Sequence, residues 1–486
     1  MRRGVLPLSS RIPITHMTRQ RAIVTTVITA LLIDLLAFTI ILPLFPRLLN
    51  YYREQESDEG TLLSYALQVM EHYKDWITAS TNDRGDKWDT VLLGGLLGSM
   101  FSLLQFFVSP MIGRASDRMG RRRVLLLTMV GNLLSSAMWI FAQSFSMFLL
   151  ARIVAGLSEG NVQLSIAIIS DVTEPEKRSR HLALVGIAFA VAFTLGPAIG
   201  AWFASVDLSQ LHPIAAERLG IYPYSTPALV ALVLLLIETV YIYFKLPETI
   251  NGRSSNTSKS SDETSTQPVS DALAIDTRLA NLRRLKWIHG LHLFLFSGME
   301  FTLVFLTFDV LDYTNMQQGK LLAYMGILSA LLQGGYVRRR VQKLGEKALV
   351  LQGMVSCTIG LVCLGVMSSP SLSTTSSVRW LYAGVSCLAL TTGTVVNCLT
   401  GLASLQCQDD KAKDTHPLLA KGRALGEFRS SGQLGRALGP ISACGLYWIA
   451  GPQRCYAAAA LGMGLITILT AAAAPTTKHT SKAKNE

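Results

Sequence analysis

The sequence has few charged residues and lacks the cysteine patterns of a disulfide or metal site. Asp, Glu, Lys and Arg make up only 16% of the 486 residues, whereas hydrophobic residues make up 50%. All seven cysteines lie between Cys357 and Cys455 without a CxxC pair, so neither a disulfide framework nor a zinc site is expected. HExxH, nucleophile-elbow and phosphate-binding glycine motifs are also missing, which argues against an enzyme and against a bound cofactor.

The apolar residues are gathered in blocks that are long enough to cross a lipid bilayer. A spanning helix needs about 20 mostly apolar residues, and one soluble core of this length needs much less apolar sequence. We count twelve blocks, which predict an all-α integral membrane protein. The blocks of the first half are residues 23–45, 91–112, 124–141, 148–170, 182–204 and 227–246, and those of the second half are residues 287–308, 321–337, 348–367, 380–406, 424–450 and 455–474.

The twelve blocks divide the chain into two equal halves. We expect one six-helix bundle over residues 23–246 and another over residues 287–474, which is the organisation of carriers built from two repeats. Residues 247–286 between them are rich in Ser and Thr and predict a disordered cytosolic linker. Within the long, acidic, non-cytosolic loop 46–90, residues 62–76 have the composition of a helix on the membrane surface.

Lys and Arg in the tails and short loops predict the orientation of the chain. The N-terminal tail 1–22, the loops 114–123, 177–180 and 338–347, and the C-terminal tail 475–486 are basic, and they alternate with loops poor in Lys and Arg. Because basic loops stay on the cytosolic side, both termini are expected in the cytosol. This bias accounts for the net charge of +12, so nucleic acid is not an expected partner.

The most specific motif stands between the second and the third apolar block. Residues 113–123 read Gly-Arg-Ala-Ser-Asp-Arg-Met-Gly-Arg-Arg-Arg, and the arginines alone would fit an ordinary cytosolic loop. Gly113 and Gly120 allow a tight turn between closely packed helices. Asp117, surrounded by cations, can cap a neighbouring helix and hold a network of charges together. Such a network can form in one conformation and break in another.

This loop resembles the loop signature of the major facilitator superfamily at every defining position. The matching residues are Gly113, Asp117, Arg118, Gly120, Arg121 and Arg122. The resemblance implies the major facilitator fold, with twelve transmembrane helices in two six-helix bundles. It also implies a conformational latch, in which Asp117 docks against the eleventh helix when the carrier is open outward. An acidic residue at the end of the fourth helix joins this latch in the family, and Asp171 stands at that place here.

Other segments of the first half are similar to the drug/proton antiporters of that superfamily. Asp34 is followed nine positions later by Pro43, and residues 152–156 match the Arg-x-x-x-Gly motif, although Glu159 replaces the small residue usual there. Pro247-Glu248-Thr249 at the end of the sixth block is also familiar from these carriers. The element associated with antiporters, Gly-Pro-x-x-Gly, is formed by Gly196, Pro197 and Gly200. We expect it to permit a kink and close packing against the opposite half.

The second half departs from the family pattern in its corresponding loop. Residues 335–340 keep a basic cluster but have no Asp, so the latch is expected to be strong in the first half and weak in the second. The chain as a whole, including the stretch ending at Glu300 and residues 436–440, is similar to the tetracycline-transporter-like proteins of animals. These are regarded as organic-anion carriers, so the resemblance implies an organic anion as substrate.

Ionisable residues inside apolar helices are functional candidates, because a charge in a bilayer is costly. Asp34 and Arg152 are interpreted as a proton-coupling pair, with a static packing pair as the alternative. Glu300 is a further proton-coupling candidate, or else a residue at a helix end that faces water. The candidates for the substrate cavity are Glu159, Glu238 and Arg436. Arg429 lies seven residues before Arg436 on the same helix face, and it belongs either to the cavity or to the latch.

These features predict a secondary active transporter of small organic solutes that works by alternating access and is coupled to protons. Antiport and symport remain open, because both use the same residues. The resemblance implies amphiphilic organic anions as substrates. We expect a monomer in the plasma membrane or in an endolysosomal, nuclear or endoplasmic reticulum membrane. The alternative is a non-transporting membrane scaffold or chaperone that keeps the carrier fold and binds a partner protein through loop 46–90 or the linker.

Overall fold

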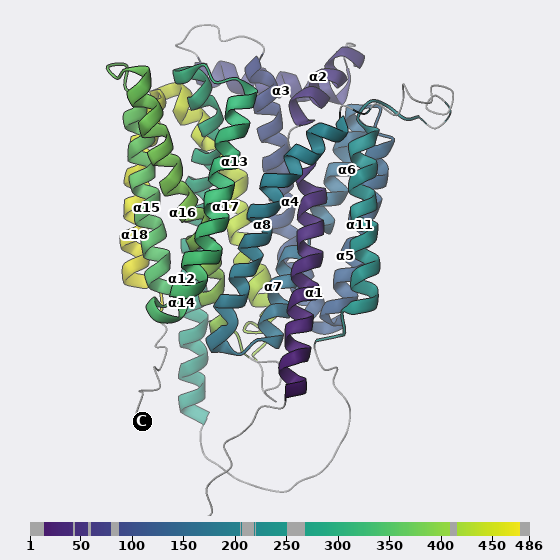
Figure 1. The fold of residues 1–486 in the computed structure, drawn as a ribbon, viewed down its shortest axis with the longest axis vertical. Coiled ribbons are helices and arrows are strands. Elements are labelled where there is room, and N and C mark those ends of the chain that lie inside the picture. The colour runs from purple at the N-terminus through teal and green to yellow at the C-terminus, as the bar shows by residue number, and fades with distance from the viewer. Residues whose placement is uncertain are drawn as a thin grey trace, which may run out of the picture.

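Long helices run between two opposite ends of the molecule and form one bundle (Figure 1). The computed structural model describes residues 14–41, 44–56, 60–78, 87–204, 206, 218, 220–249, 268–408 and 416–476. Within these ranges every regular element is helical, and ten helices are long and apolar enough to cross a membrane. The chain is therefore a multi-pass membrane protein with an all-α fold, as the apolar blocks predict.

The helices of the first half follow the predicted blocks with two additions. The elements are α1 (Ile14–Thr39), α2 (Phe45–Gln55), α3 (Leu62–Thr78), α4 (Lys87–Met119), α5 (Arg121–Ile140), α6 (Phe145–Ser158), α7 (Asn161–Val172), α8 (Pro175–Ala204) and α11 (Ser225–Lys245). The helix expected over residues 62–76 is confirmed as α3, whereas α2 was not predicted. The fourth block was predicted as one helix, but it is divided into α6 and α7 at Glu159 and Gly160.

The second half contains six long helical segments. The elements are α12 (Pro268–Leu311), α13 (Asn315–Leu331), the π-helix η2 (Leu332–Val337), α14 (Arg338–Leu344), α15 (Glu346–Met367), α16 (Thr374–Gln406), α17 (Lys421–Ala450) and α18 (Pro452–Ala473). Helix α13 begins with a capping box, in which the side chain of Thr314 and that of Gln317 each bind the backbone of the other residue. Helices α13 and α17 are not among the ten apolar ones, so the count of twelve spans stays a prediction.

Helix α12 is longer than the sequence suggested. It begins at Pro268, so residues 268–286 are helical, in contrast to the disordered linker expected over 247–286. The physical reason is an apolar face at helical spacing, because Leu282 and Leu285 are buried and Ile275 and Leu279 pack beside them. Residues 250–267 of the expected linker lie outside the described residues, as do residues 1–13 and 477–486 of the two tails.

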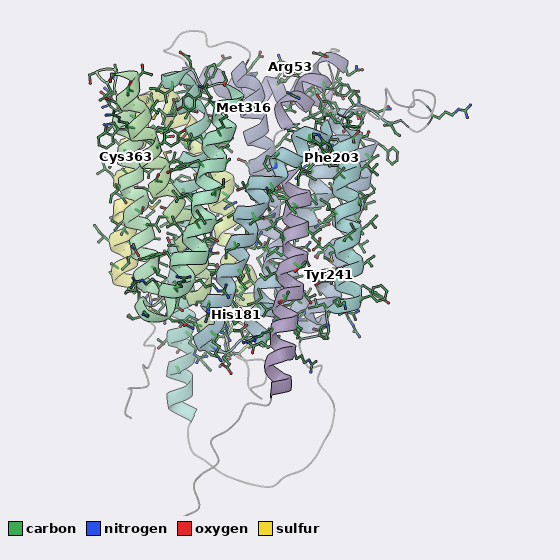
Figure 2. The ribbon with its side chains drawn as sticks, in the orientation of Figure 1. Arg53, His181, Phe203, Tyr241, Met316 and Cys363 are labelled. Carbon is green, nitrogen blue, oxygen red and sulfur yellow. The ribbon has the colours of Figure 1, made fainter. Side chains whose placement is uncertain are left out.

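The loops rich in Lys and Arg and the two termini of the helical bundle lie at the same end of the molecule. Helices α1 and α12 begin and α18 ends at one end, which also holds the junctions α4–α5, α7–α8 and α14–α15 (Figure 1). We call it the basic end. Helices α2 and α3 lie at the opposite end, which we call the α3 end. Figure 2 shows His181 at the basic end and Arg53 and Met316 at the α3 end.

Helices of the two halves pack against each other along two seams. Helix α4 of the first half lies along α17 of the second, and α8 lies along α13, η2, α14 and α16. Small residues permit the first seam, because Gly113 on α4 faces Gly422 and Gly426 on α17. Both seams reach the basic end, where the predicted latch residues are found.

Candidate transport site and conformational latch

Asp117 joins the junction between α4 and α5 to the first turn of α17. Its Oδ1 accepts a hydrogen bond from the backbone N–H of Gly422 at 2.8 Å, and its Oδ2 accepts one from the N–H of Arg423 at 2.7 Å. The N–H groups at the start of a helix have no partner within the helix and carry a positive partial charge. A carboxylate of the first half therefore caps a helix of the second half.

Arg121 stands at the centre of a buried network of charges. Its side chain is fully buried, and it donates to Asp117 at 2.7 Å and to Asp171 at 3.0 Å. Lys421, the first residue of α17, lies 3.3 Å from the other carboxylate oxygen of Asp171. Two carboxylates thus face two cations, and the network includes both halves of the chain. The sequence suggested Asp117, Arg121 and Asp171 for this place, but not Lys421.

Gly113 and Gly120 are both required by the local geometry. A Cβ atom at Gly113 would collide with the carbonyl oxygen of Gly422, so only glycine allows α4 and α17 to approach this closely. Gly120 has φ +97°, a conformation that favours glycine, and it allows α5 to start directly after α4 ends.

Glu248 caps α5 and was not recognised as a latch residue. Its two carboxylate oxygens accept hydrogen bonds from the backbone N–H groups of Arg121 at 2.9 Å and Arg122 at 3.2 Å. The guanidinium of Arg122 lies over the ring of Tyr243, 5.3 Å from its centroid. Arg118 is exposed and forms no hydrogen bond or ion pair with the rest of the described chain.

The second half contributes a contact of its own at the basic end. Ser179, near the start of α8, donates a hydrogen bond of 2.6 Å to Glu346, the first residue of α15. Beside it, Arg178 donates to the carbonyl oxygen of Ser404 on α16 at 2.9 Å. Arg178, Ser179 and Glu346 are all buried. The second half therefore has an acidic residue at this junction, although residues 335–340 have none.

A second set of charged residues lies deeper between α1, α6, α7 and α11. Asp34 is 3% exposed, and its Oδ1 accepts a hydrogen bond of 2.7 Å from the side-chain amide of Asn161. Thr128 of α5 donates to the carbonyl oxygen of that amide at 3.2 Å, which fixes its orientation. Asn161 is the first residue of α7, so the break between α6 and α7 brings it to Asp34.

The expected pairing of Asp34 with Arg152 differs from the arrangement in the structure. Arg152 interacts electrostatically with Glu159 and lies over the ring of Phe101, 5.1 Å from its centroid. The cation that interacts with Asp34 is Arg429 of α17, which also interacts with Glu159. The cluster is thus shared by both halves. Because Asp34 and Arg152 are 118 positions apart, the sequence did not show which acid each arginine would meet.

Glu238 of α11 adds a third acidic residue to this cluster. It is 1% exposed, it interacts with Asp34 and Glu159, and its Oε2 has no hydrogen-bond partner among the described residues. Three carboxyl groups therefore meet two guanidinium groups, those of Arg152 and Arg429. The cluster therefore holds one acid more than its cations can neutralise. A buried charge without a counterion is costly.

Arg436 and Glu300 form a separate pair within the second half. They interact electrostatically, and Arg436 is exposed although it stands in the middle of α17. Two buried histidines of α12, His289 and His292, also interact with Arg436 and were not predicted. The ring of His289 stacks on that of Phe428, with centroids 4.2 Å apart. These histidines stand three positions apart, at helical spacing, which was the only signal for them in the sequence.

Comparison with known proteins decides the family. The family model described as Major Facilitator Superfamily matches residues 27–415. The chain belongs to the major facilitator superfamily. Its relatives include Major facilitator superfamily domain-containing protein 10 of Mus musculus, which is 34% identical over 454 residues, 90% of each chain. Tetracycline resistance protein, class B, of Escherichia coli is 25% identical over 318 residues, 64% of this chain and 70% of that protein.

A solved structure agrees with the fold over almost its whole length. The crystal structure of the human organic anion transporter MFSD10 (TETRAN) superimposes with a TM-score of 0.75 and 32% sequence identity, and covers 93% of this chain and 99% of that one. The resemblance to the tetracycline-transporter-like members of the superfamily is thereby confirmed. These relatives are transporters, not enzymes.

The Gly-Pro-x-x-Gly element of this superfamily member packs within its own half, not against the opposite half as expected. A Cβ atom at Gly196 would collide with the side chain of Thr39, and one at Gly200 would collide with the backbone of Ile40. Both contacts are with the end of α1, and α8 continues through Pro197 to Ala204. The element therefore allows α8 to lie close to α1, the helix that carries Asp34.

Proposed function

We propose that the chain is a secondary active carrier of small organic anions, which works by alternating access and exchanges protons at Asp34. The observation that carries this proposal is the cluster of Asp34, Glu159 and Glu238 with Arg152 and Arg429, in which Asp34 and Glu238 are buried and the other three residues are half-buried. It contains one acid more than its cations, and it includes residues of both halves. An exchangeable proton neutralises the carboxylate that has no counterion, and movement of α17 changes the position of Arg429 relative to Asp34.

The anion-binding part of the proposal rests on α17. Arg429 and Arg436 stand two turns apart on one face of this helix, and Arg436 is exposed. A guanidinium is suited to bind a carboxylate or sulfonate, because it presents several donors in one plane. Glu300, which interacts with Arg436, is the second proposed proton-coupling residue, and Glu159 and Glu238 stay proposed as residues of the substrate cavity. The description of the human structure as an organic anion transporter supports this assignment.

The residues at the basic end act as a latch in this proposal. The contacts of Asp117, Arg121 and Asp171 with α17 hold the basic end closed, and the opposite side opens while they persist. We place the basic end in the cytosol, together with both termini, since its loops are rich in Lys and Arg. We propose a monomer that resides in the plasma membrane or an internal membrane.

The test is transport by the purified chain in proteoliposomes, with and without a pH gradient. Flux of a panel of labelled aromatic carboxylates and sulfonates is measured for the unchanged chain, Asp34→Asn and Asp312→Asn. We expect flux driven by the pH gradient in the unchanged chain and in Asp312→Asn, because Asp312 is exposed in the loop between α12 and α13. Asp34→Asn should lose the gradient dependence.

Each result bears on one part of the proposal. If flux through the unchanged chain does not depend on the pH gradient, proton coupling is contradicted. If Asp34→Asn and Asp312→Asn lose the gradient dependence equally, a specific role of Asp34 is contradicted. An absence of flux for the whole panel would favour the scaffold alternative. In that case, deletion of residues 251–267 should abolish partner binding if the linker, and not loop 46–90, binds the partner.

A further inference from the structure

A basic pocket lies between the two halves at the basic end, apart from the latch and the charged cluster. Its volume is about 420 Å³, and its lining consists of Arg180, Gly334, Arg338, Arg339 and Gln342. Arg180 stands on α8 of the first half, whereas the other four belong to η2 and α14 of the second half. A molecule bound in this pocket would contact both halves.

The three arginines of the pocket have no acidic partner within the described part of the chain. Arg180 and Arg339 are exposed, and no ion pair with either is present there. The Nε of Arg338 is buried without a hydrogen-bond partner among the described residues. By contrast, Arg121 at the junction of α4 and α5 binds two carboxylates. Three cations that converge on one cavity without counterions favour an anionic ligand with several oxygen atoms.

The local backbone helps to form the pocket. Residues 332–337 are a π-helix, which widens the turn between α13 and α14. Gly334 has no side chain, and a Cβ atom there would only reach ordinary contact distance from Ile187 of α8. The space between α8 and η2 is therefore left open at the level of the arginines.

An apolar strip on the outer surface leads towards this pocket. Ile327 is 53% exposed and Leu331 is 67% exposed. They precede Gly335 and Arg339 at intervals of four residues, so the four positions follow one side of the helical run. Exposed apolar side chains on a membrane protein contact acyl chains. The strip thus joins the hydrocarbon region to the three cations, an arrangement that suits a lipid better than a free phosphate ion.

We propose that this pocket binds the phosphorylated headgroup of an anionic phospholipid, whose acyl chains lie along Ile327 and Leu331. Basic pockets between transmembrane helices on the cytosolic side are suited to such headgroups, and the cytosolic leaflet is rich in anionic lipid. The placement in that leaflet rests on the orientation proposed above. Because the headgroup contacts α8 and α14 together, it stabilises the conformation in which these helices lie side by side.

The test measures lipid binding directly and does not require transport. The full chain in an uncharged detergent is titrated with a phosphatidylinositol bisphosphate, and the rise in Tm gives the affinity. We expect Arg338→Gln combined with Arg339→Gln to weaken binding about 30-fold, since each basic residue contributes about 1 kcal/mol. Arg340→Gln is the control, because Arg340 is an exposed arginine of the same helix that does not line the pocket.

Two further comparisons distinguish the possible ligands. Leu331→Gln should weaken binding of the lipid, whereas the soluble inositol trisphosphate headgroup and inorganic phosphate should bind weakly to every variant. If soluble headgroup binds as tightly as lipid, the ligand is a soluble phosphate compound and the lipid assignment is wrong. If Arg340→Gln weakens binding as much as the double variant, the effect is general surface charge and the pocket is not the site. A lack of binding to the unchanged chain would also overturn the proposal, whatever the result of the transport assay.

Discussion

The two halves close the basic end with different chemistry at corresponding helix junctions. In both halves a glycine with positive φ, Gly120 at +97° or Gly345 at +79°, precedes a helix whose first residue makes the contact. In the first half that residue is Arg121, which belongs to a network of four charges. In the second half it is Glu346, which accepts a hydrogen bond from a neutral serine.

This difference indicates where the contacts between the two halves at the basic end are strongest. The charges around Arg121 are buried together, so the loss of one leaves its partners without compensation. Ser179 is neutral and donates one hydrogen bond to Glu346, and most hydrogen bonds contribute only about 1 kcal/mol. We therefore expect substitutions in the first junction to have the larger effects.

The largest effect is expected for Arg121→Met, which keeps most of the side-chain volume but removes the charge. Asp117 and Asp171 would then lose the cation that they share, and loss of one partner of a buried pair costs about 3–5 kcal/mol. The Tm of the purified chain in detergent measures this change. Arg118→Ala is the control from the same loop, because Arg118 is exposed. Similar losses in both variants would mean that the network does not stabilise the fold.

An intermediate effect is expected for Gly113→Ala on α4, compared with Gly335→Ala in η2, at the corresponding place in the second half. The new methyl group at position 113 would meet the carbonyl of Gly422, and such overpacking costs about 1–3 kcal/mol. At Gly335 nothing lies within 4 Å, so alanine should be tolerated. Crosslinking between cysteines placed on α4 and α17 at the basic end should fall only for Gly113→Ala. Equal yields in the two variants would contradict the close approach as the cause.

The smallest effect is expected for Ser179→Ala, which removes the donor to Glu346. One hydrogen bond of this kind contributes about 1 kcal/mol. A double variant with Glu346→Gln tests the coupling between the two residues, since Tm losses that simply add would show that they do not interact. Ser369→Ala, on an exposed turn of the second half, serves as the control.

The sequence was most informative where the important residues are neighbours in the chain. The segment 113–123 contains Gly113, Asp117, Gly120 and Arg121 within eleven positions, and the structure brings Gly113, Asp117 and Arg121 together at the start of α17. Arg118 belongs to the same pattern but is exposed at the surface. A linear motif thus predicted the place of the contact but not every participant.

Contacts between distant segments were harder to predict. Asp34 was paired with Arg152, yet Asn161 and Arg429 are the residues that interact with it. The break between α6 and α7 turns Asn161 towards α1, and no apolar periodicity shows that break. Glu346 was missed for a similar reason, since its partner Ser179 is 167 residues away in the other half.

The sequence by itself determined the class of the protein. Apolar blocks of membrane-spanning length, basic loops and the family motif each consist of consecutive residues, so they can be recognised without the tertiary structure. The sequence indicated an all-α membrane carrier of the major facilitator superfamily and the loop that closes the basic end. Only the tertiary structure decided which charges meet, that α8 packs on α1 through Gly196 and Gly200, and that three arginines of two halves line one pocket. The physical reason is that helical periodicity assigns a residue to a face, whereas the partner of that face depends on the packing of helices far apart in sequence.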